Sequence, residues 1–103
     1  MVFYSPTARK DLAEIRKGLL GWEKIVLSVE SVFEYMRDIK RVCDSIDNKQ
    51  LHFNTKYETH QQHGEKAHTY KRNANTVWYI IYNIDSENNI FINKIISNYL
   101  TKS

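Results

Sequence analysis

Basic and hydroxyl-bearing side chains gather in one short stretch of the C-terminal third of the chain. His68, Lys71 and Arg72 lie close together in the sequence, with Tyr70 among them. Lysine and arginine bind phosphate, and a histidine with an unperturbed pKa of about 6.5 can give or take a proton near neutral pH. An aromatic and aliphatic run, residues 77–82, follows directly. The stretch therefore predicts either the polar edge of a core sheet or a sheet surface that faces an anionic partner.

Each of these residues also has a purely structural interpretation. Charges on an edge strand deter edge-to-edge pairing, so Lys71 and Arg72 could mark a solvated strand edge. His68 could make a surface hydrogen bond instead of transferring a proton. His60 and His63 share a polar segment without the carboxylates or cysteines that would complete a zinc shell, and we interpret them as solvated loop residues. We expect no metal and no cofactor, and the sequence has no Gly-rich phosphate loop.

Length and composition limit the architecture that can position these residues. The chain has 103 residues and one cysteine, which predicts a single domain over 1–103 without an internal disulfide. We expect Cys43 to be buried, in a protein of the reducing cytoplasm. The net charge of +3 favours anionic partners mildly. No apolar run approaches the roughly 18 residues that a membrane span needs, and no secretory signal is recognisable, so we expect no membrane partner.

The first half of the sequence predicts an opening strand and two helices. Residues 1–5 are apolar and aromatic, which is typical of a short strand. Ser5 followed by Pro6 is a helix start, because serine caps the first turn and proline has no N–H to leave unpaired there; it opens a helix predicted over 6–18. A three-and-four spacing of apolar residues without proline or glycine predicts a second, long amphipathic helix over 22–46.

The second half predicts a polar connection and three strands. Residues 47–67 are polar, although alternating apolar residues over 51–57 indicate a short strand or edge segment within them. Strands are predicted over 66–74, 77–84 and 89–97. Helices followed by consecutive strands define the α+β class, which here means two N-terminal helices packed on one face of an antiparallel sheet.

Helices on one face of a sheet leave the other face open. In the strand over 77–84, one side carries Trp78, Ile80, Tyr82 and Ile84, and the other carries Tyr79, Ile81 and Asn83. In the strand before it, one side carries His68, Tyr70 and Arg72, and the other carries Thr69, Lys71 and Asn73. The set with Tyr79 is the more polar and predicts the open face, whereas Trp78 and Tyr82 are predicted to be core. Basic and aromatic side chains on one sheet face suit RNA, because charges bind phosphate and rings stack on bases.

Three segments, taken in order, resemble toxins of the RelE/ParE superfamily from bacterial type II toxin–antitoxin systems. "YSPTARKDLAEI" resembles the opening strand and helix of that family, "HTYKRNANTVWYIIYNID" its basic strand, turn and Tyr-rich strand, and "NNIFINKIISNYL" its closing strand. The resemblance covers most of the chain. It implies a β-α-α-β-β-β fold of the microbial-ribonuclease type, a plasmid-stabilization role, and a cognate antitoxin protein as partner. We expect a segment of that antitoxin to cover the basic strand.

The resemblance also implies site residues. Nuclease members act on mRNA with groups on the open sheet face and the C-terminal tail, which transfer protons and stabilise phosphate charge while a 2′-OH attacks the backbone. The corresponding catalytic positions here are His68, Lys71, Arg72, Tyr79 and Tyr99. The corresponding RNA-binding positions are Lys66, Tyr70, Lys94 and Lys102. Tyr79 stands where the family has an arginine, and Tyr99 and Lys102 stand near the end where many members carry a basic closing motif.

Three functions therefore compete. The first is a ribosome-dependent mRNA endoribonuclease, which the basic and acid–base groups of residues 66–72 favour. The second is a ParE-like inhibitor of DNA gyrase, because gyrase-poisoning members lack the catalytic set, and Tyr79 in place of the arginine fits this reading. The third is a catalytically degenerate module that only engages an antitoxin or RNA.

Overall fold

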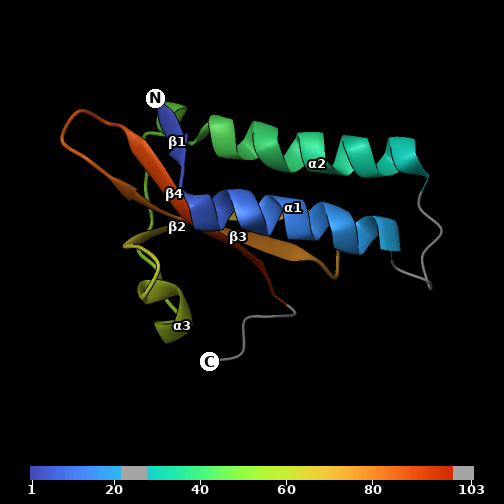
Figure 1. Ribbon diagram of the computed structural model, residues 1–103. Coiled ribbons are helices and arrows are strands. Elements are labelled where there is room, and N and C mark those ends of the chain that lie inside the picture. Colours follow the sequence, from blue (N-terminus) through green and yellow to red (C-terminus); the bar gives the residue numbers. More distant parts are fainter. Residues whose placement is uncertain (22–27, 99–103) are drawn as a thin grey trace.

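The structure is a computed structural model that describes residues 1–21 and 28–98 (Figure 1). Its elements follow in the order β1 (Val2–Tyr4), α1 (Pro6–Gly21), α2 (Val29–Asp44), the 3-10 helix η1 (Ile46–Asn48), α3 (Glu58–Gln61), β2 (Lys66–Lys71), β3 (Val77–Ile84) and β4 (Ile90–Ser97). The four strands form one sheet in the order β1-β4-β3-β2. The predicted α+β class is confirmed.

The sheet is mixed, so the prediction of an antiparallel sheet is wrong for one strand. Strands β2, β3 and β4 pair antiparallel, as consecutive strands joined by short turns do, but β1 pairs parallel with β4. A hairpin fixes an antiparallel direction, whereas a connection that runs through helices permits a parallel one. Strand β1 is joined to the rest of the sheet through α1 and α2, and the sequence holds no local signal for its direction.

Helix α1 begins as predicted and ends later. The Ser5 Oγ accepts a hydrogen bond from the Ala8 N–H at 3.0 Å, which is the expected N-cap. The helix then continues through Gly18 to Gly21, so the predicted end at 18 is wrong. An isolated glycine costs a helix only about 1 kcal/mol relative to alanine, which the packing of α1 against β4 offsets.

Helix α2 begins later than predicted. Ser28 is its N-cap, with Oγ accepting from the Ser31 N–H at 3.1 Å, and the helix starts at Val29. The first part of the predicted long helix, residues 22–27, lies outside the described residues. The helix ends at Asp44 and is followed by η1. None of the helices in the described parts of the chain has both the length and the apolar character that a bilayer span requires.

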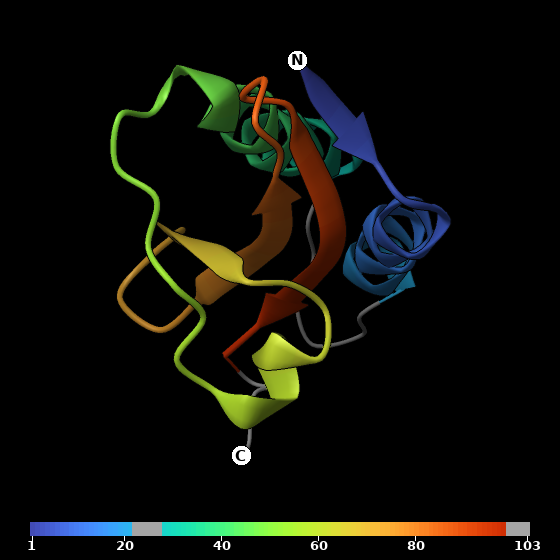
Figure 2. The same ribbon diagram turned by 90° about the vertical axis from the view of Figure 1, so that its left-hand side faces the viewer.

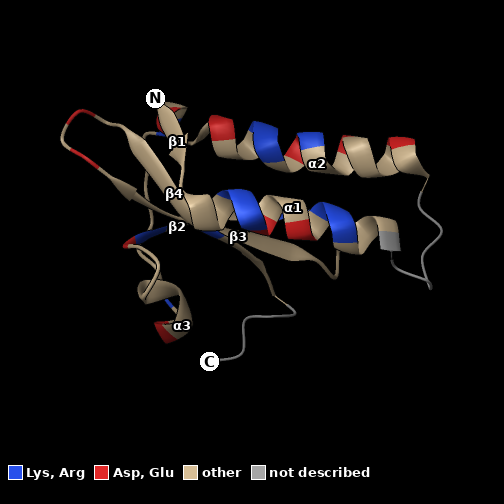
Figure 3. Cartoon of the chain, in the orientation of Figure 1, with Lys and Arg blue, Asp and Glu red and all other residues tan. Residues whose placement is uncertain are grey.

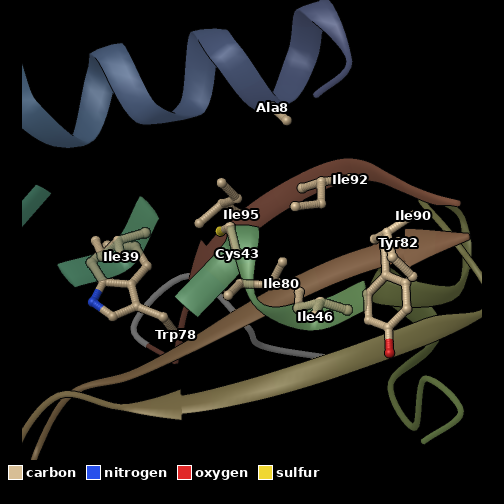
Figure 4. Packing of buried hydrophobic residues seen from close by; sticks show 10 residues of the cluster. All are labelled: Ala8, Ile39, Cys43, Ile46, Trp78, Ile80, Tyr82, Ile90, Ile92 and Ile95. Carbon is tan, nitrogen blue, oxygen red and sulfur yellow. The ribbon is translucent and has the colours of Figure 1, made fainter. Parts of the chain in front are cut away.

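The two long helices and the sheet enclose an aliphatic and aromatic core (Figure 4). Its buried members are Ala8, Ile39, Cys43, Ile46, Trp78, Ile80, Tyr82, Ile90, Ile92 and Ile95. The predicted burial of Cys43, Trp78 and Tyr82 is confirmed. Burial raises the pKa of the Cys43 thiol to about 12, so the thiolate that would react or bind a metal does not form near neutral pH.

Asp11 attaches α1 to an irregular part of β4. The β3–β4 register shifts between Ile81 and Tyr82, which are paired with Lys94 and Ile92, respectively. Asp11 is only 6% exposed; it accepts the Ile95 N–H at 3.0 Å and the Lys94 Nζ at 2.9 Å. A buried carboxylate is tolerated when it is paired and hydrogen-bonded in this way.

The polar connection between η1 and β2 first extends the sheet and then crosses its open face (Figure 2). Asn54 forms an isolated antiparallel bridge with Lys66, and the Thr55 N–H donates to the Glu65 carbonyl at 2.9 Å. The predicted edge segment is therefore present, as a very short one. Helix α3 was not predicted, because its four residues are too few to show a helical period.

Gly64 sits where this connection passes close to β3. A Cβ at Gly64 would lie 2.9 Å from the Tyr82 carbonyl oxygen and 3.1 Å from Ile81 Cγ2. Since the carbonyl is backbone of the central strand β3, it cannot yield easily. We expect Gly64→Ala to lower the free energy of unfolding by about 1–3 kcal/mol in a denaturant titration.

The matched control is Gly18→Ala. A Cβ at Gly18 would meet no atom within 4 Å, so alanine there is expected to stabilise α1 by about 1 kcal/mol. Equal, small effects of the two substitutions would show that residue 64 does not contact β3 closely.

Candidate functional site

The pairing of β2 with β3 decides on which face of the sheet each candidate residue lies. His68 is opposite Ile80, and Thr69 is opposite Tyr79. Residues directly opposite each other on neighbouring strands point to the same face. The open face therefore carries Ala67, Thr69, Lys71 and Tyr79, and the face covered by helices carries His68, Tyr70 and Arg72. The predicted catalytic set is split between the two faces of the sheet.

Arg72 is bound to α2. Its guanidinium forms an ion pair with Asp38 and lies over the ring of Tyr35, with 4.4 Å from Cζ to the ring centroid. The same group donates a hydrogen bond to the Tyr70 hydroxyl at 3.1 Å. The hydrogen bond from Arg72 is the main cause that lowers the pKa of Asp38. Arg72 and Tyr70 thus join the β2–β3 hairpin to the helix layer, which is not the RNA-facing position that the sequence predicted for them.

This contact gives a testable prediction about stability. We expect Arg72→Ala to lower the thermal unfolding midpoint, because Asp38 loses its partner and the Tyr35 ring loses its packing cation. Arg37→Ala, at an exposed position of α2, is the control and should change the free energy of unfolding by no more than about 0.5 kcal/mol. Equal midpoints for Arg72→Ala and the wild type would show that the contacts of Arg72 with Asp38 and Tyr35 do not stabilise the fold.

His68 belongs to a second polar group on the helix-covered face. It is partly buried, and burial is the main cause that lowers its pKa; the charges of Lys49 and His52 act in the same direction. The His52 Nδ1 lies 2.7 Å from the Tyr82 hydroxyl. Burial raises the pKa of Tyr82 to about 12. Two imidazoles and a phenol therefore share this region, on the face opposite to Lys71 and Tyr79.

Three aromatic rings meet on the open face. The ring centroids of Tyr57 and His60 lie 5.8 and 4.9 Å from that of Tyr79, and 5.1 Å from each other. His60 is only 1% exposed, so its interpretation as a solvated loop residue is wrong: α3 turns this imidazole inward, against β3. Sequence reasoning missed the cluster, and its only local signal is the one-turn spacing of Tyr57 and His60.

The protonation states of this cluster follow from its burial. Burial is the main cause that lowers the pKa of His60, and the charge of His63 adds to the shift, so the imidazole is neutral at pH 7. Burial, followed by a hydrogen bond with Tyr57, raises the pKa of Tyr79. The Tyr79 phenol therefore remains protonated at physiological pH and can donate a hydrogen bond or a proton, but it cannot serve as a base.

Of the predicted catalytic residues that the structure describes, Lys71 and Tyr79 lie together on the open face. Lys71 is exposed and pairs with Val77, which places it diagonally to Tyr79 at a Cα separation of roughly 7–8 Å. From neighbouring strands on one face of the sheet, the Lys71 ammonium and the protonated Tyr79 phenol can hold a phosphate and donate to one of its oxygens.

The remaining predicted RNA contacts are engaged within the chain or not described. The Lys66 Nζ donates to Asn54 Oδ1 at 2.7 Å, and the Lys94 Nζ is paired with Asp11. Lys102, and Tyr99 of the predicted catalytic set, lie outside the described residues. Among the residues that are described, no three His, Cys, Asp or Glu side chains come together as a metal site would require.

The fold and the site together define an α+β protein with a mixed four-stranded sheet. The open face of this sheet carries Lys71 and an aromatic cluster of Tyr57, His60 and Tyr79. Comparisons of the chain with protein-family models, with curated proteins and with solved structures gave no match.

Proposed function

We propose that this protein is the toxin of a bacterial type II toxin–antitoxin pair and that it cleaves mRNA on the ribosome. The observation that carries the proposal is the order of the elements. A strand, two long helices and, after the polar connection, three consecutive strands follow one another as the RelE/ParE resemblance implies. The basic motif of residues 68–85 falls on the β2–β3 hairpin, and the opening motif of residues 4–15 falls on the end of β1 and on α1.

The open face supplies part of the chemistry for cleavage. Attack of a 2′-OH on the adjacent phosphorus breaks the bond to the 5′ oxygen and leaves a cyclic phosphate and a free 5′-OH. In this reaction Lys71 stabilises the charge on the phosphoryl oxygens, and the protonated Tyr79 phenol gives its proton to the leaving 5′ oxygen. The ring contacts of Tyr79 with Tyr57 and His60 hold the phenol in place.

One observation favours a second candidate, inhibition of DNA gyrase. Cleavage also needs a base for the 2′-OH proton, and His68, an expected acid–base group, lies on the face opposite to Tyr79. Arg72 is on that face as well and is bound to Asp38. A gyrase inhibitor needs a surface that binds protein and no convergent set of acid and base groups.

A single experiment separates the two candidates. The chain is expressed from a controlled promoter, mRNA 5′ ends are mapped, and the supercoiling activity of gyrase is assayed with the purified protein. New mRNA ends that appear only when ribosomes translate the message support the nuclease. Inhibited supercoiling with intact mRNA supports the gyrase inhibitor. Unimpaired growth with neither effect contradicts both activities and leaves a degenerate binding module.

The proposed antitoxin is a product of a neighbouring reading frame, which should restore growth when it is co-expressed. The expectation that it covers the basic strand now rests on Lys71, because Arg72 is already paired with Asp38. Lys71→Glu should therefore weaken the toxin–antitoxin complex, measured by co-purification at several salt concentrations. Arg37→Glu, a charge reversal at an exposed position of α2, is the control.

A further inference from the structure

Helix α1 carries four positive charges on the side that faces away from the sheet. Arg9, Lys10, Arg16 and Lys17 are all exposed. Residues seven positions apart lie nearly on one line along a helix, separated by about 10.5 Å. Arg9 with Arg16, and Lys10 with Lys17, therefore form two neighbouring rows. Figure 3 shows the two sequence-adjacent pairs, residues 9–10 and 16–17, as two blue bands along α1.

These four cations have no carboxylate partner in the described parts of the chain. The ion pairs found there use other cations: the N-terminal amine, Lys40, Arg41, Arg72 and Lys94. Asp11, next to Lys10 in the sequence, is buried against β4. Glu14 is the one exposed acid on α1, so the exposed side of this helix has four positive charges and one negative charge.

The stability of the helix does not explain this arrangement. Helix α1 has no acidic residue in its first turn and no basic residue in its last turn, so its charges are not placed to oppose the helix dipole. The spacing of Lys10 and Glu14 would permit an ion pair, but it has the cation on the N-terminal side, which is the weaker order.

We propose that this surface of α1, which we call the α1 basic face, binds the phosphate backbone of structured RNA. Protein interfaces depend on large anchors such as Trp, Tyr, Arg and aliphatic side chains that fill pockets. Between the two pairs of cations the exposed positions hold only Ala13 and Glu14, and the one large apolar side chain exposed on α1 is Leu20, near its C-terminal end. Phosphate contacts require long cationic side chains at a suitable spacing and no apolar pocket.

This inference rests in part on the proposed function and extends it. An enzyme that cuts mRNA on the ribosome needs a contact surface for the ribosome other than the one that meets the scissile bond, and ribosomal RNA offers a dense row of phosphates for such a contact. The α1 basic face is the exposed side of a helix that packs on β4, and α1 lies well apart from α3 (Figure 2). The molecule could therefore contact RNA with α1 while its open face remains accessible to mRNA.

The test measures binding and not cleavage. A variant with Arg9→Gln, Lys10→Gln, Arg16→Gln and Lys17→Gln keeps helix propensity nearly unchanged, and its fold is checked by thermal unfolding. Binding of a fluorescent RNA duplex of arbitrary sequence is measured by anisotropy over about 50–200 mM KCl. Each lost phosphate contact should reduce the steepness of a plot of the logarithm of the association constant against the logarithm of the KCl concentration by about 0.9. We expect a slope reduced by roughly 3–4 and binding at least about tenfold weaker at 100 mM KCl.

The matched control neutralises a second basic group, with Arg37→Gln, Lys40→Gln and Arg41→Gln on α2. It should leave the slope nearly unchanged. An equal loss in both variants would overturn the proposal, because it would mean that net charge and not α1 determines binding. The proposal would also be overturned if the α1 variant bound RNA as the wild type does but no longer bound the product of the neighbouring gene. That result would identify a protein partner for the α1 basic face. Absence of mRNA cleavage, with α1-dependent RNA binding intact, would refute only the proposed function.

Discussion

Replacing Trp78 with alanine is expected to lower the free energy of unfolding by about 3–5 kcal/mol. The indole belongs to β3 and is 8% exposed in the core between the sheet and α2. Its Nε1–H donates to the Tyr35 hydroxyl at 2.9 Å, and the two rings meet edge to face with centroids 6.4 Å apart. Truncation leaves a cavity and removes the hydrogen bond that the indole donates to the Tyr35 hydroxyl. Small domains have a total stability of about 5–15 kcal/mol, so the variant should lose a large fraction of its stability.

The measurement is chemical denaturation followed by circular dichroism, with Trp78→Phe as the control. Phenylalanine fills most of the space and removes the hydrogen bond, so it should cost distinctly less than alanine, with the missing bond contributing about 1 kcal/mol. A Trp78→Ala variant as stable as Trp78→Phe would show that the ring does not fill the core. Loss of toxicity in Trp78→Ala alone therefore says nothing about the site.

The position of Trp78 shows what the sequence can predict. Side chains of a strand alternate between two faces, and an apolar set opposite a more polar set identifies the buried side without knowledge of the neighbours. Alternation along residues 77–84 therefore predicted the burial of Trp78 and Tyr82 correctly. The helix start at Ser5 was also predictable, because an N-cap is a contact between residues three positions apart.

Which candidate residues share a face of the sheet depends on how β2 pairs with β3. The alternation of side chains within each strand does not reveal that pairing. His68 and Lys71 were correctly placed on opposite sides of β2. Which side faces Tyr79 follows from the β2–β3 turn, where the Arg72 N–H donates to the Thr76 carbonyl at 2.9 Å and fixes the register. A register shifted by one residue would have exchanged the two sets.

His60 illustrates a second limit of sequence reasoning. A buried histidine in a polar segment has no apolar pattern around it, and α3 is a single turn whose position is set by nonlocal contacts. These include the close approach of Gly64 to β3 and the hydrogen bond from Asn93 Nδ2 to the His63 carbonyl at 2.8 Å. Neither contact is visible in the sequence, so the cluster around Tyr79 required the structure.

If the protein cleaves mRNA, Tyr79→Phe and Lys71→Ala are each expected to slow cleavage by about 10²–10⁴-fold. Phenylalanine at 79 keeps the ring against His60 and removes only the hydroxyl that would protonate the leaving oxygen, at a cost of about 1 kcal/mol for the lost hydrogen bond with Tyr57. Lys71 is exposed, so alanine there should leave stability within about 0.5 kcal/mol of the wild type. The rates are measured by primer extension on ribosome-bound mRNA.

Thr69→Ala is the control for this experiment, because Thr69 lies opposite Tyr79 on the same exposed face and has no proposed part in the chemistry. Its cleavage rate should equal that of the wild type. His68→Ala decides between the two faces of the sheet. If His68→Ala folds normally and abolishes cleavage while Tyr79→Phe cleaves normally, the reacting groups lie on the helix-covered face with His52 and Tyr82. If Tyr79→Phe and Lys71→Ala cleave normally and His68→Ala does too, none of these three side chains performs the reaction, and the nuclease assignment loses its chemical basis in the described residues.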